Sequence, residues 1–376
     1  MPICVAVPHE TVSGERRVAL VPAVAEQLAK QGVDILLQAG AGAAAFYRDD
    51  EYTSARLTED RAELLGAADI LLTVQPLDED AIGQLREGSI VIGFLHPHEH
   101  PERIAQMRER NITSFAVELI PRLSRAQSMD ALSSQASIAG YKAALMAASR
   151  TARFFPMLTT AAGTIRPAKV LVIGVGVAGL QAIATARRLG AMVEAYDVRP
   201  ETREQVESLG AKFVDVQVKA EGSGGYAREL TEEEKQQEVA VLAEHVIQAD
   251  AIISTAAVPG RPAPCIISAD MVDHMKHGAV IIDLAAESGG NCELTVPGEA
   301  FGHERVMIYG PLNVPAMLPV HASEMYAKNL YNFLSLIIRD GKLDPDWDDE
   351  IVASSVLTHA GEIRHEPTRK AVEAAS

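Results

Sequence analysis

A glycine-rich hexapeptide, Gly174-Val-Gly-Val-Ala-Gly179, has the pattern G-x-G-x-x-G. The backbone amides of such a turn, together with the positive N-terminal end of a following helix, can bind a diphosphate. Gly174 would permit the tight turn, Gly176 would let a phosphate approach the backbone, and Gly179 would let helix and strand pack closely. The hexapeptide alone is a weak signal, because glycine-rich hexamers also arise by chance.

The segments around the hexapeptide make this interpretation more specific. A strand is expected at 169–173, a helix at 180–189 and a second strand at 192–196, which ends at Asp197. A carboxylate there can accept hydrogen bonds from an adenosine ribose and would repel a 2′-phosphate, although a solvated strand end is the alternative. Arg199 complicates the preference, since a nearby arginine can hold a 2′-phosphate. Because the carboxylate lies at the strand end itself, we expect NAD rather than NADP.

A second polar segment, residues 121–135, contains Arg122, Gln127, Asp130 and Ser133 just before an alanine-rich stretch. It is consistent with an exposed loop in which Asp130 caps the next helix. It is also consistent with a cluster that orients a nicotinamide, with Arg122 paired to Asp130 while Gln127 and Ser133 hold the carboxamide and ribose. The pattern alone leaves both interpretations open.

Short apolar β-branched runs alternate with helix-period segments along most of the chain, which predicts an α/β fold with parallel sheets. We expect two Rossmann-like domains joined by long helices, at 1–132 plus 322–376 and at 133–321. The expected strands of the first are 3–7, 33–37, 69–74, 89–94 and 113–116, with helices at 22–31 and 101–110. The second follows a long helix at 133–155 and has strands at 169–173, 192–196, 211–216, 250–254, 279–284 and 306–309. A helix at 323–338 and a hairpin near 358–363 should return the chain to the first domain.

Composition excludes several classes of protein. The 376 residues include 34 Lys and Arg against 51 Asp and Glu, a net charge of −17 that argues against nucleic-acid binding. The three cysteines are far apart and form no C-x-x-C pair, so neither a disulfide framework nor a thiolate metal site is expected. We expect no signal peptide and no membrane-spanning helix. The loop with His96, His98 and His100 could bind zinc, but it lacks a further ligand beyond Glu99, so no physiological metal is expected.

The polar segment closely resembles the Arg-Gln-Asp loop of the NAD(H)-binding domain I of proton-translocating nicotinamide nucleotide transhydrogenase. The resemblance extends over nearly the whole chain. Its other segments are 14–20 (GERRVAL), 161–163 (AAG), 258–264 (VPGRPAP), 283–292 (DLAAESGGNC) and 328–330 (KNL).

The resemblance implies a separately encoded α1-type subunit that is a homodimer and binds NAD(H). It implies docking on membrane-bound partners, an α2-type subunit and a β subunit that carries the NADP(H)-binding domain III. Fused members continue into membrane helices, whereas this chain stops at Ser376, so the proton channel is expected in other chains. The chain would then be cytoplasmic and peripheral on the inner membrane.

The resemblance also implies roles for individual residues. The nicotinamide side is assigned to Arg122, Gln127, Asp130 and Ser133. The cofactor-binding positions are Gly174, Val175, Gly176, Val177 and Gly179 at the diphosphate, Asp197, Val198 and Arg199 at the adenosine, Gly225 and Tyr226 in a mobile loop, and Gln237 and Ala257.

Two alternatives and two departures accompany this hypothesis. An alanine dehydrogenase would need a proton acceptor and a carboxylate clamp, yet residues 73–76 (TVQP) lack the lysine of that family, although Arg17 and His96 remain. A non-catalytic NAD-binding module is the other alternative.

The sequence departs from the family's pattern at two places. Met317 replaces a usual arginine after Asn313-Val-Pro, and the loop with His96, His98 and His100 is unusual. Both departures concern local details near the cleft.

Overall fold

A computed structural model describes residues 2–215, 232–257 and 261–375, without the side chains of 232–238 and 375. The chain forms two compact units. Unit 1 comprises 1–135 and 316–376, and unit 2 comprises 136–315. The α/β class with two parallel-dominated sheets is confirmed. Helix α5 (Ala131–Arg150) runs from unit 1 into unit 2, and α10 (Pro319–Ile337) begins shortly after the chain re-enters unit 1. The division at 132/133 and 321/322 stays a prediction.

Unit 1 is built on an eight-stranded sheet in the order β19-β18-β6-β5-β4-β1-β2-β3. The strands from β6 to β3 are parallel, whereas β18 is antiparallel to both β6 and β19. The C-terminal hairpin therefore returns to the first sheet, as predicted. The strands are β1 (Cys4–Val7), β2 (Asp34–Gln38), β3 (Ala55–Thr58), β4 (Ile70–Leu72), β5 (Ile90–Gly93), β6 (Thr113–Ala116), β18 (Val356–His359) and β19 (Glu362–Ile363).

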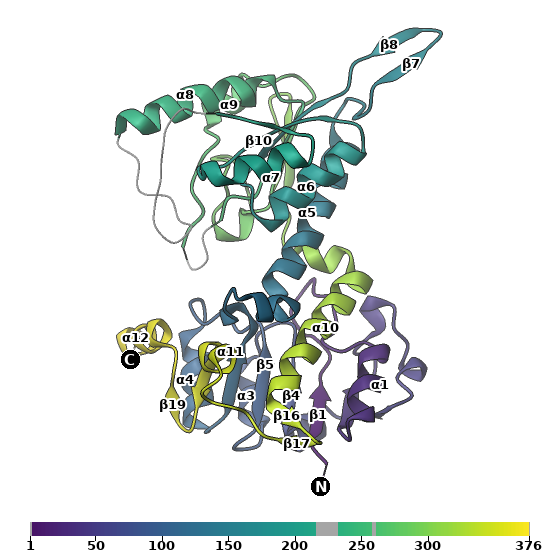
Figure 1. The fold of residues 1–376 in the computed structure, drawn as a ribbon, viewed down its shortest axis with the longest axis vertical. Helices are drawn as coiled ribbons and strands as arrows, with labels where there is room; N and C mark the ends of the chain where they lie inside the picture. Colours follow the sequence, from purple (N-terminus) through teal and green to yellow (C-terminus); the bar gives the residue numbers. More distant parts are fainter. Residues whose placement is uncertain (1, 216–231, 258–260, 376) are drawn as a thin grey trace. The chain divides into compact units, whose positions relative to one another are not determined.

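Helices cover both faces of this sheet, and the residues alternate accordingly. Val5 and Val7 pack in one core with α1 (Pro22–Lys30), α10 and α11 (Glu350–Ser355). Ala6 packs in the other core with the remaining helices. These are α2 (Arg61–Ala67), α3 (Glu79–Gln84), α4 (Pro101–Glu109) and α12 (Glu366–Ala375). Figure 1 shows α1 and α10 on one side of the sheet and α4 and α12 on the other.

Unit 2 has a seven-stranded sheet in the order β11-β10-β9-β12-β13-β15-β14. All neighbours are parallel except β14 and β15. The order reverses between β9 and β12, the point at which open α/β sheets bind ligands beyond the carboxyl ends of their strands. The strands are β9 (Lys169–Ile173), β10 (Met192–Tyr196), β11 (Lys212–Phe213), β12 (Ala251–Ser254), β13 (Val280–Asp283), β14 (Ala300–His303) and β15 (Val306–Tyr309).

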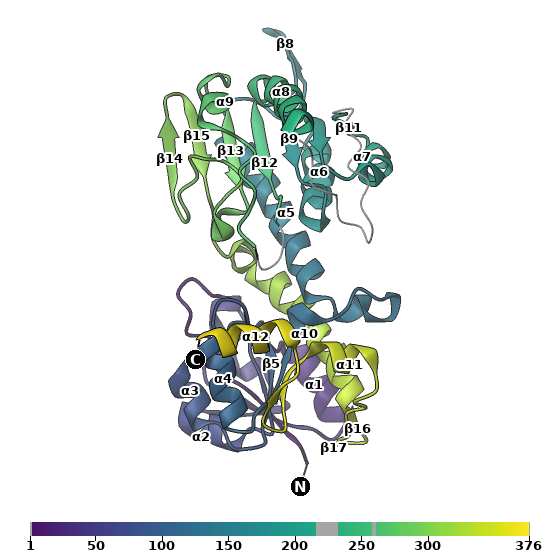
Figure 2. The same cartoon turned by 90° about the vertical axis from the view of Figure 1, so that its left-hand side faces the viewer.

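Helices also flank this second sheet. Apolar side chains of α8 (Glu232–Gln248) and α9 (Ala269–Asp273) pack with Leu171, Ile252 and Ile281 on one face. Helix α6 (Val177–Arg188) packs against β9 and β10, and the short α7 (Arg203–Ser208) precedes β11. Figure 2 shows β14, β15, β13, β12 and β9 in this order across the sheet, with α6 beside β9.

Several strands in small hairpins and at sheet edges were not expected. A hairpin of β7 (Leu158–Thr160) and β8 (Gly163–Ile165) projects from unit 2 with every residue exposed (Figure 1). Strands β3 and β14 extend the edges of the two large sheets, and β16 (Ile338–Arg339) pairs with β17 (Lys342–Leu343). Within the described ranges, no helix is both long and apolar enough to cross a membrane.

Candidate dinucleotide site

The glycine-rich turn connects β9 to α6 at the point where the sheet order reverses. Gly174 has φ of +89°, a conformation that L side chains rarely adopt, and its amide donates to the Tyr196 carbonyl at 2.8 Å. Gly176 is the N-cap of α6, and no side chain there accepts from the first amides of the helix. These amides and the helix dipole leave an anion-binding end at the carboxyl edge of the sheet.

The last two glycines of the motif meet different surroundings. A Cβ built on Gly179 would lie 1.9 Å from the Gly174 carbonyl oxygen, so this glycine is required by packing of the helix against its own turn. A Cβ built on Gly176 meets nothing within 4 Å. The backbone at Gly176 therefore faces open space beside the helix N-terminus, where a side chain would otherwise project.

Gly140 of α5 is a packing position beside the glycine turn that the sequence does not reveal. A Cβ there would lie 2.0 Å from the Ala178 carbonyl oxygen, so α5 touches the first turn of α6 backbone to backbone. Thr255 after β12 holds the turn from another direction, because its hydroxyl donates to the Gly174 carbonyl at 2.9 Å. A glycine inside an alanine-rich helix gives no periodic signal, which explains why the contact of Gly140 was not predicted.

Asp197 follows β10 and points back to the glycine turn. Its Oδ2 accepts from the Val175 amide at 2.7 Å, and its side chain is 6% exposed. Arg199 donates its amide at 2.9 Å and Nε at 2.9 Å to Oδ1, and Nη2 at 3.0 Å to Oδ2. The structure thus brings Val175, Asp197 and Arg199 together, while the apolar side chains of Val177 and Val198 remain exposed.

A buried carboxylate positions the loop that follows β12. Asp283 is fully buried at the end of β13 and accepts from Ser254, Thr295 and three backbone amides, including that of Asn291 at 2.8 Å. The Asn291 side chain in turn accepts from the Ala256 amide at 3.0 Å and donates to its carbonyl at 2.7 Å. This network fixes the chain beside Ala257, which is exposed. The segment 283–292 carries part of the resemblance, but its sequence does not reveal this role.

The Arg-Gln-Asp segment lies in unit 1, as a 3-10 helix at Ser124–Met129 followed by α5. Asp130 accepts from the Ser133 amide at 2.8 Å and from its hydroxyl at 2.6 Å, so it caps α5. The ion pair between Arg122 and Asp130 that the second interpretation assumed does not form, because Arg122 makes no ion pair with any described residue, and the capping interpretation describes Asp130 as it lies here. The side chains of Arg122 and Gln127 are exposed.

Other side chains hold this segment in place. Arg125 binds both carboxylate oxygens of Asp349 at the start of α11, at 2.8 and 3.0 Å. The side-chain amides of Asn329 and Asn332, both on α10, donate to the Ser128 carbonyl at 2.9 and 3.0 Å. Three side chains, those of Arg125, Asn329 and Asn332, thus hold the segment in place. The side chains of Arg122 and Gln127 face solvent. Gly225 and Tyr226 lie outside the described residues, as does the side chain of Gln237.

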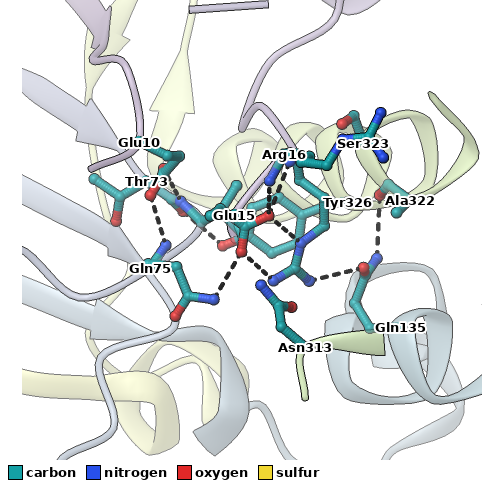
Figure 3. Close-up of polar contacts among 12 residues, drawn as sticks. Glu10, Glu15, Arg16, Thr73, Gln75, Gln135, Asn313, Ala322, Ser323 and Tyr326 are labelled. Atoms are coloured by element: carbon teal, nitrogen blue, oxygen red, sulfur yellow. Dashed lines mark hydrogen bonds and ion pairs between the residues drawn. The ribbon is translucent and has the colours of Figure 1, made fainter. Parts of the chain in front are cut away.

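Unit 1 has a polar cluster of its own where its sheet order reverses, between β1 and β4. The Glu10 carboxylate accepts from the Val74 and Gln75 amides at 2.6 and 3.1 Å, and burial raises its pKa to about 7 (Figure 3). Glu15 is also buried. Burial pushes its pKa up, but Arg17 at 2.7 Å and the Gln75 side chain at 2.7 Å bring its pKa down to about 2. The Arg17 guanidinium also donates to Gln135 at 3.0 Å, so internal partners hold this cation.

The histidine-rich loop shows no metal geometry. His96 has φ of +45°, and its amide donates to the buried Glu118 carboxylate at 2.7 Å. Its ring faces Glu99, whereas the ring of His100 faces Glu102. In the part of the chain that the structure describes, no three His, Cys, Asp or Glu side chains gather as metal ligands.

The sheet order, the glycine turn at its reversal point and the carboxylate of Asp197 define a dinucleotide-binding α/β protein. Residues 6–139 match the N-terminal domain of the alanine dehydrogenase/PNT family, and residues 143–366 match its C-terminal domain. The chain belongs to the alanine dehydrogenase/PNT family.

Similar proteins narrow the relationship within the family. The chain is 45% identical to the first part of NAD(P) transhydrogenase subunit alpha from Rhodospirillum rubrum, over 96% of this chain and 97% of that one. The crystal structure of transhydrogenase from Sinorhizobium meliloti matches with a TM-score of 0.85 and 41% identity, over 97% and 99% of the two chains. Alanine dehydrogenase of Mycobacterium tuberculosis is 28% identical, over 96% and 95%. These findings support an NAD-dependent oxidoreductase role of the transhydrogenase type.

Proposed function

We propose that this chain is the NAD(H)-binding subunit of a proton-translocating NAD(P) transhydrogenase. Hydride passes between NADH bound in unit 2 and NADP bound on the domain III of a partner subunit, and separate membrane subunits couple the transfer to proton movement. The observation that carries the proposal is the open space at Gly176, beside the N-terminus of α6. Asp197, which follows the neighbouring strand β10, accepts a hydrogen bond from the Val175 amide of the same turn. The similarity to transhydrogenase alpha subunits supports a transhydrogenase reaction over an amino-acid dehydrogenase reaction.

Each part of the site has a binding or orienting task. When bound, NADH supplies the hydride of its dihydronicotinamide ring. Gly174, Val175, Gly176, Val177 and Gly179 form the turn that binds the diphosphate, and Asp197, Val198 and Arg199 hold the adenosine. Arg122, Gln127, Asp130 and Ser133 orient the nicotinamide end. Gly225, Tyr226, Gln237 and Ala257 complete the cofactor contacts that the resemblance implies.

Hydride transfer between two nicotinamide rings moves no proton at the reacting carbon. It requires proximity, alignment and exclusion of water, and it requires no general acid or base. The exposed Arg122 and Gln127 on a firmly anchored segment suit this orienting task, because their side chains are available while their backbone is fixed. Asp130 contributes by capping α5 and thereby fixing the direction in which the segment enters the helix.

The alternative of an amino-acid dehydrogenase is disfavoured by the polar cluster of unit 1. Such an enzyme needs a cation that clamps the substrate carboxylate and a group that accepts a proton. Here Glu15 and Gln135 already hold Arg17, and Gln75 rather than a lysine lies beside them. A non-catalytic NAD-binding module would share the whole of the unit 2 site, so only the activity measurement separates it.

The assembly is proposed as a homodimer that docks on the cytoplasmic face of the membrane-bound α2-type and β subunits. The β7–β8 hairpin supports a second copy as partner, because Leu158 and Ile165 are exposed on paired strands that have no core of their own. Large exposed apolar side chains on a projecting arm are typical of interaction sites. The net charge of −17 favours docking on a basic face, with an association rate that falls as salt increases.

The proposal is tested by reduction of an acetylpyridine analogue of NAD by NADPH, with this chain alone and then mixed with a transhydrogenase domain III. Activity only in the mixture is the expected result, because each component binds one of the two nucleotides. Reduction of NAD by L-alanine with this chain alone would establish the dehydrogenase alternative. NADH binding without any activity in the mixture would leave a binding module.

A further inference from the structure

The peptide group between Gly174 and Val175 is held at both of its ends. Its carbonyl oxygen, on Gly174, accepts from the Thr255 hydroxyl at 2.9 Å, and its amide, on Val175, donates to Asp197 Oδ2 at 2.7 Å. Because a peptide group is planar, these two hydrogen bonds together fix the direction in which the whole plane faces. They come from the two strands that flank β9, since Asp197 follows β10 and Thr255 follows β12.

Thr255 also lies against two glycines of the turn. Its Oγ1 would lie 2.7 Å from a Cβ built on Gly174 and 3.3 Å from one built on Gly179. The Thr255 amide donates to the Ile173 carbonyl at 2.8 Å, so the pairing of β12 with β9 fixes where this side chain begins. The hydroxyl therefore occupies the space that the two glycines leave by having no side chain.

The residues on either side of Thr255 bind other parts of unit 2. The Ser254 hydroxyl donates to the buried Asp283 at 2.9 Å, and the Ala256 amide donates to the Asn291 side chain at 3.0 Å. Ser254 thus makes a hydroxyl hydrogen bond as long as that of Thr255, one residue earlier, but to a carboxylate outside the glycine turn. This difference makes Ser254 a matched control for the hydroxyl of Thr255.

We propose that Thr255 is a positioning residue for the diphosphate, because its hydroxyl holds the plane of the 174–175 peptide and thereby the direction of the amides that follow. This inference rests on the proposed function, since it concerns the diphosphate part of the same site. Gly176, the N-cap of α6, comes directly after this peptide. A plane that is held at one end only can turn about the bonds beside it, and the amides beyond it then lose their common direction. An anion that binds several amides of a helix N-terminus at once requires that direction.

The test measures the affinity for NADH and 5′-ADP by calorimetry, and the affinity for adenosine, which has no phosphate, by competition with NADH. Thr255→Val removes the hydroxyl and keeps the branched shape of the side chain. It should weaken NADH and 5′-ADP by about three- to tenfold, the range of one neutral hydrogen bond, and leave adenosine unchanged. Thr255→Ser restores a hydroxyl and should restore both affinities. Ser254→Ala should leave all three affinities unchanged.

Steady-state kinetics of the mixture with domain III give a second measurement. Thr255→Val should raise the KM for acetylpyridine NAD and leave kcat unchanged, because the diphosphate is bound alike in the ground state and the transition state. Equal losses for 5′-ADP and adenosine in Thr255→Val would overturn the inference, as would an equal loss for 5′-ADP in Ser254→Ala. If Thr255→Val does not fold, Thr255→Ala takes its place beside Thr255→Ser, and the same results support or overturn the inference.

Failure of the inference and failure of the proposed function give different results. A wild-type chain that binds NADH but is inactive with domain III would overturn the proposed reaction, and the titrations would still decide the role of Thr255. A wild-type chain that binds neither NADH nor 5′-ADP would overturn the proposed site, and this inference with it.

Discussion

At the scale of single residues, Gly176 and Gly179 belong to one motif but serve different ends. A methyl group at Gly176 enters open space, and its φ of −81° suits alanine, so Gly176→Ala should change the free energy of unfolding by less than about 1 kcal/mol. The same methyl group occupies the space assigned to the diphosphate, so NADH binding should be lost. Calorimetric titration and thermal unfolding of one sample measure both effects.

Gly179→Ala is the matched control, because its Cβ would collide with the Gly174 carbonyl. It should destabilise the protein by about 1–3 kcal/mol, as overpacked sites do, and should weaken NADH binding as well. If Gly176→Ala bound NADH as the wild type does, the diphosphate would not lie where we place it.

The Glu10 carboxyl predicts a pH dependence of stability. Its pKa is about 7 in the folded chain against 4.5 for an ordinary glutamate, so the folded state binds more protons between these values. Stability from this group is therefore greatest below pH 4.5 and is lost as the pH rises to 7, by about 3 kcal/mol for the difference in pKa. Denaturant unfolding at pH 5 and pH 8 measures this.

Glu10→Gln removes the titrating group, so the difference between the two pH values should become smaller in the variant. Glu15 gives the opposite dependence at lower pH, since its pKa of about 2 means that its stabilisation is lost as the pH falls below 4.5. An unchanged difference between pH 5 and pH 8 in Glu10→Gln would show that Glu10 is ionised throughout this range.

At the scale of elements, the cap of α5 separates the structural task of Asp130 from its proposed functional one. Asp130→Ala should destabilise unit 1 by about 1 kcal/mol through loss of the cap, whereas asparagine caps a helix nearly as well. If the charge of Asp130 also orients the nicotinamide, Asp130→Asn should keep stability but lose hydride transfer in the mixture with domain III. Full activity of Asp130→Asn would reduce its task to capping.

The β7–β8 hairpin gives a second prediction at this scale. Replacing Leu158 and Ile165 by serine removes exposed apolar surface without touching a core, so the unfolding of each protomer should change little. Sedimentation velocity should show a dimer for the wild type and a weaker dimer for the double variant. A wild-type monomer at micromolar concentration would contradict the homodimer.

The elements that the sequence predicted well are those with buried, apolar parallel strands. The strands at 113–116, 169–173, 192–196 and 306–309 have the predicted bounds. The strand at 169–173 shows the reason most clearly, because burial of residues 170–173 leaves a continuous apolar run. Exposed strands such as β3, β7 and β8 lack this signal. Of the site, the turn and Asp197 follow from spacing, but the Arg199–Asp197 pairing and the contact of Gly140 with Ala178 depend on three-dimensional geometry.

At the scale of the whole molecule, we propose that this chain contributes one nicotinamide and orienting groups, and that it contributes no acid or base to the chemical step. The proposed dinucleotide site belongs to unit 2, and the Arg-Gln-Asp segment, which we propose to orient the nicotinamide, belongs to unit 1. The fate of the transferred hydrogen reports directly on this claim.

The decisive measurement is transfer of deuterium from NADPH deuterated at the reactive C4 position to acetylpyridine NAD, in ordinary water, by this chain mixed with domain III. Direct hydride transfer predicts that the label is fully retained in the reduced analogue and that Gly176→Ala abolishes its formation. Loss of the label to solvent, or product formed by this chain without domain III, would contradict direct transfer at a shared site.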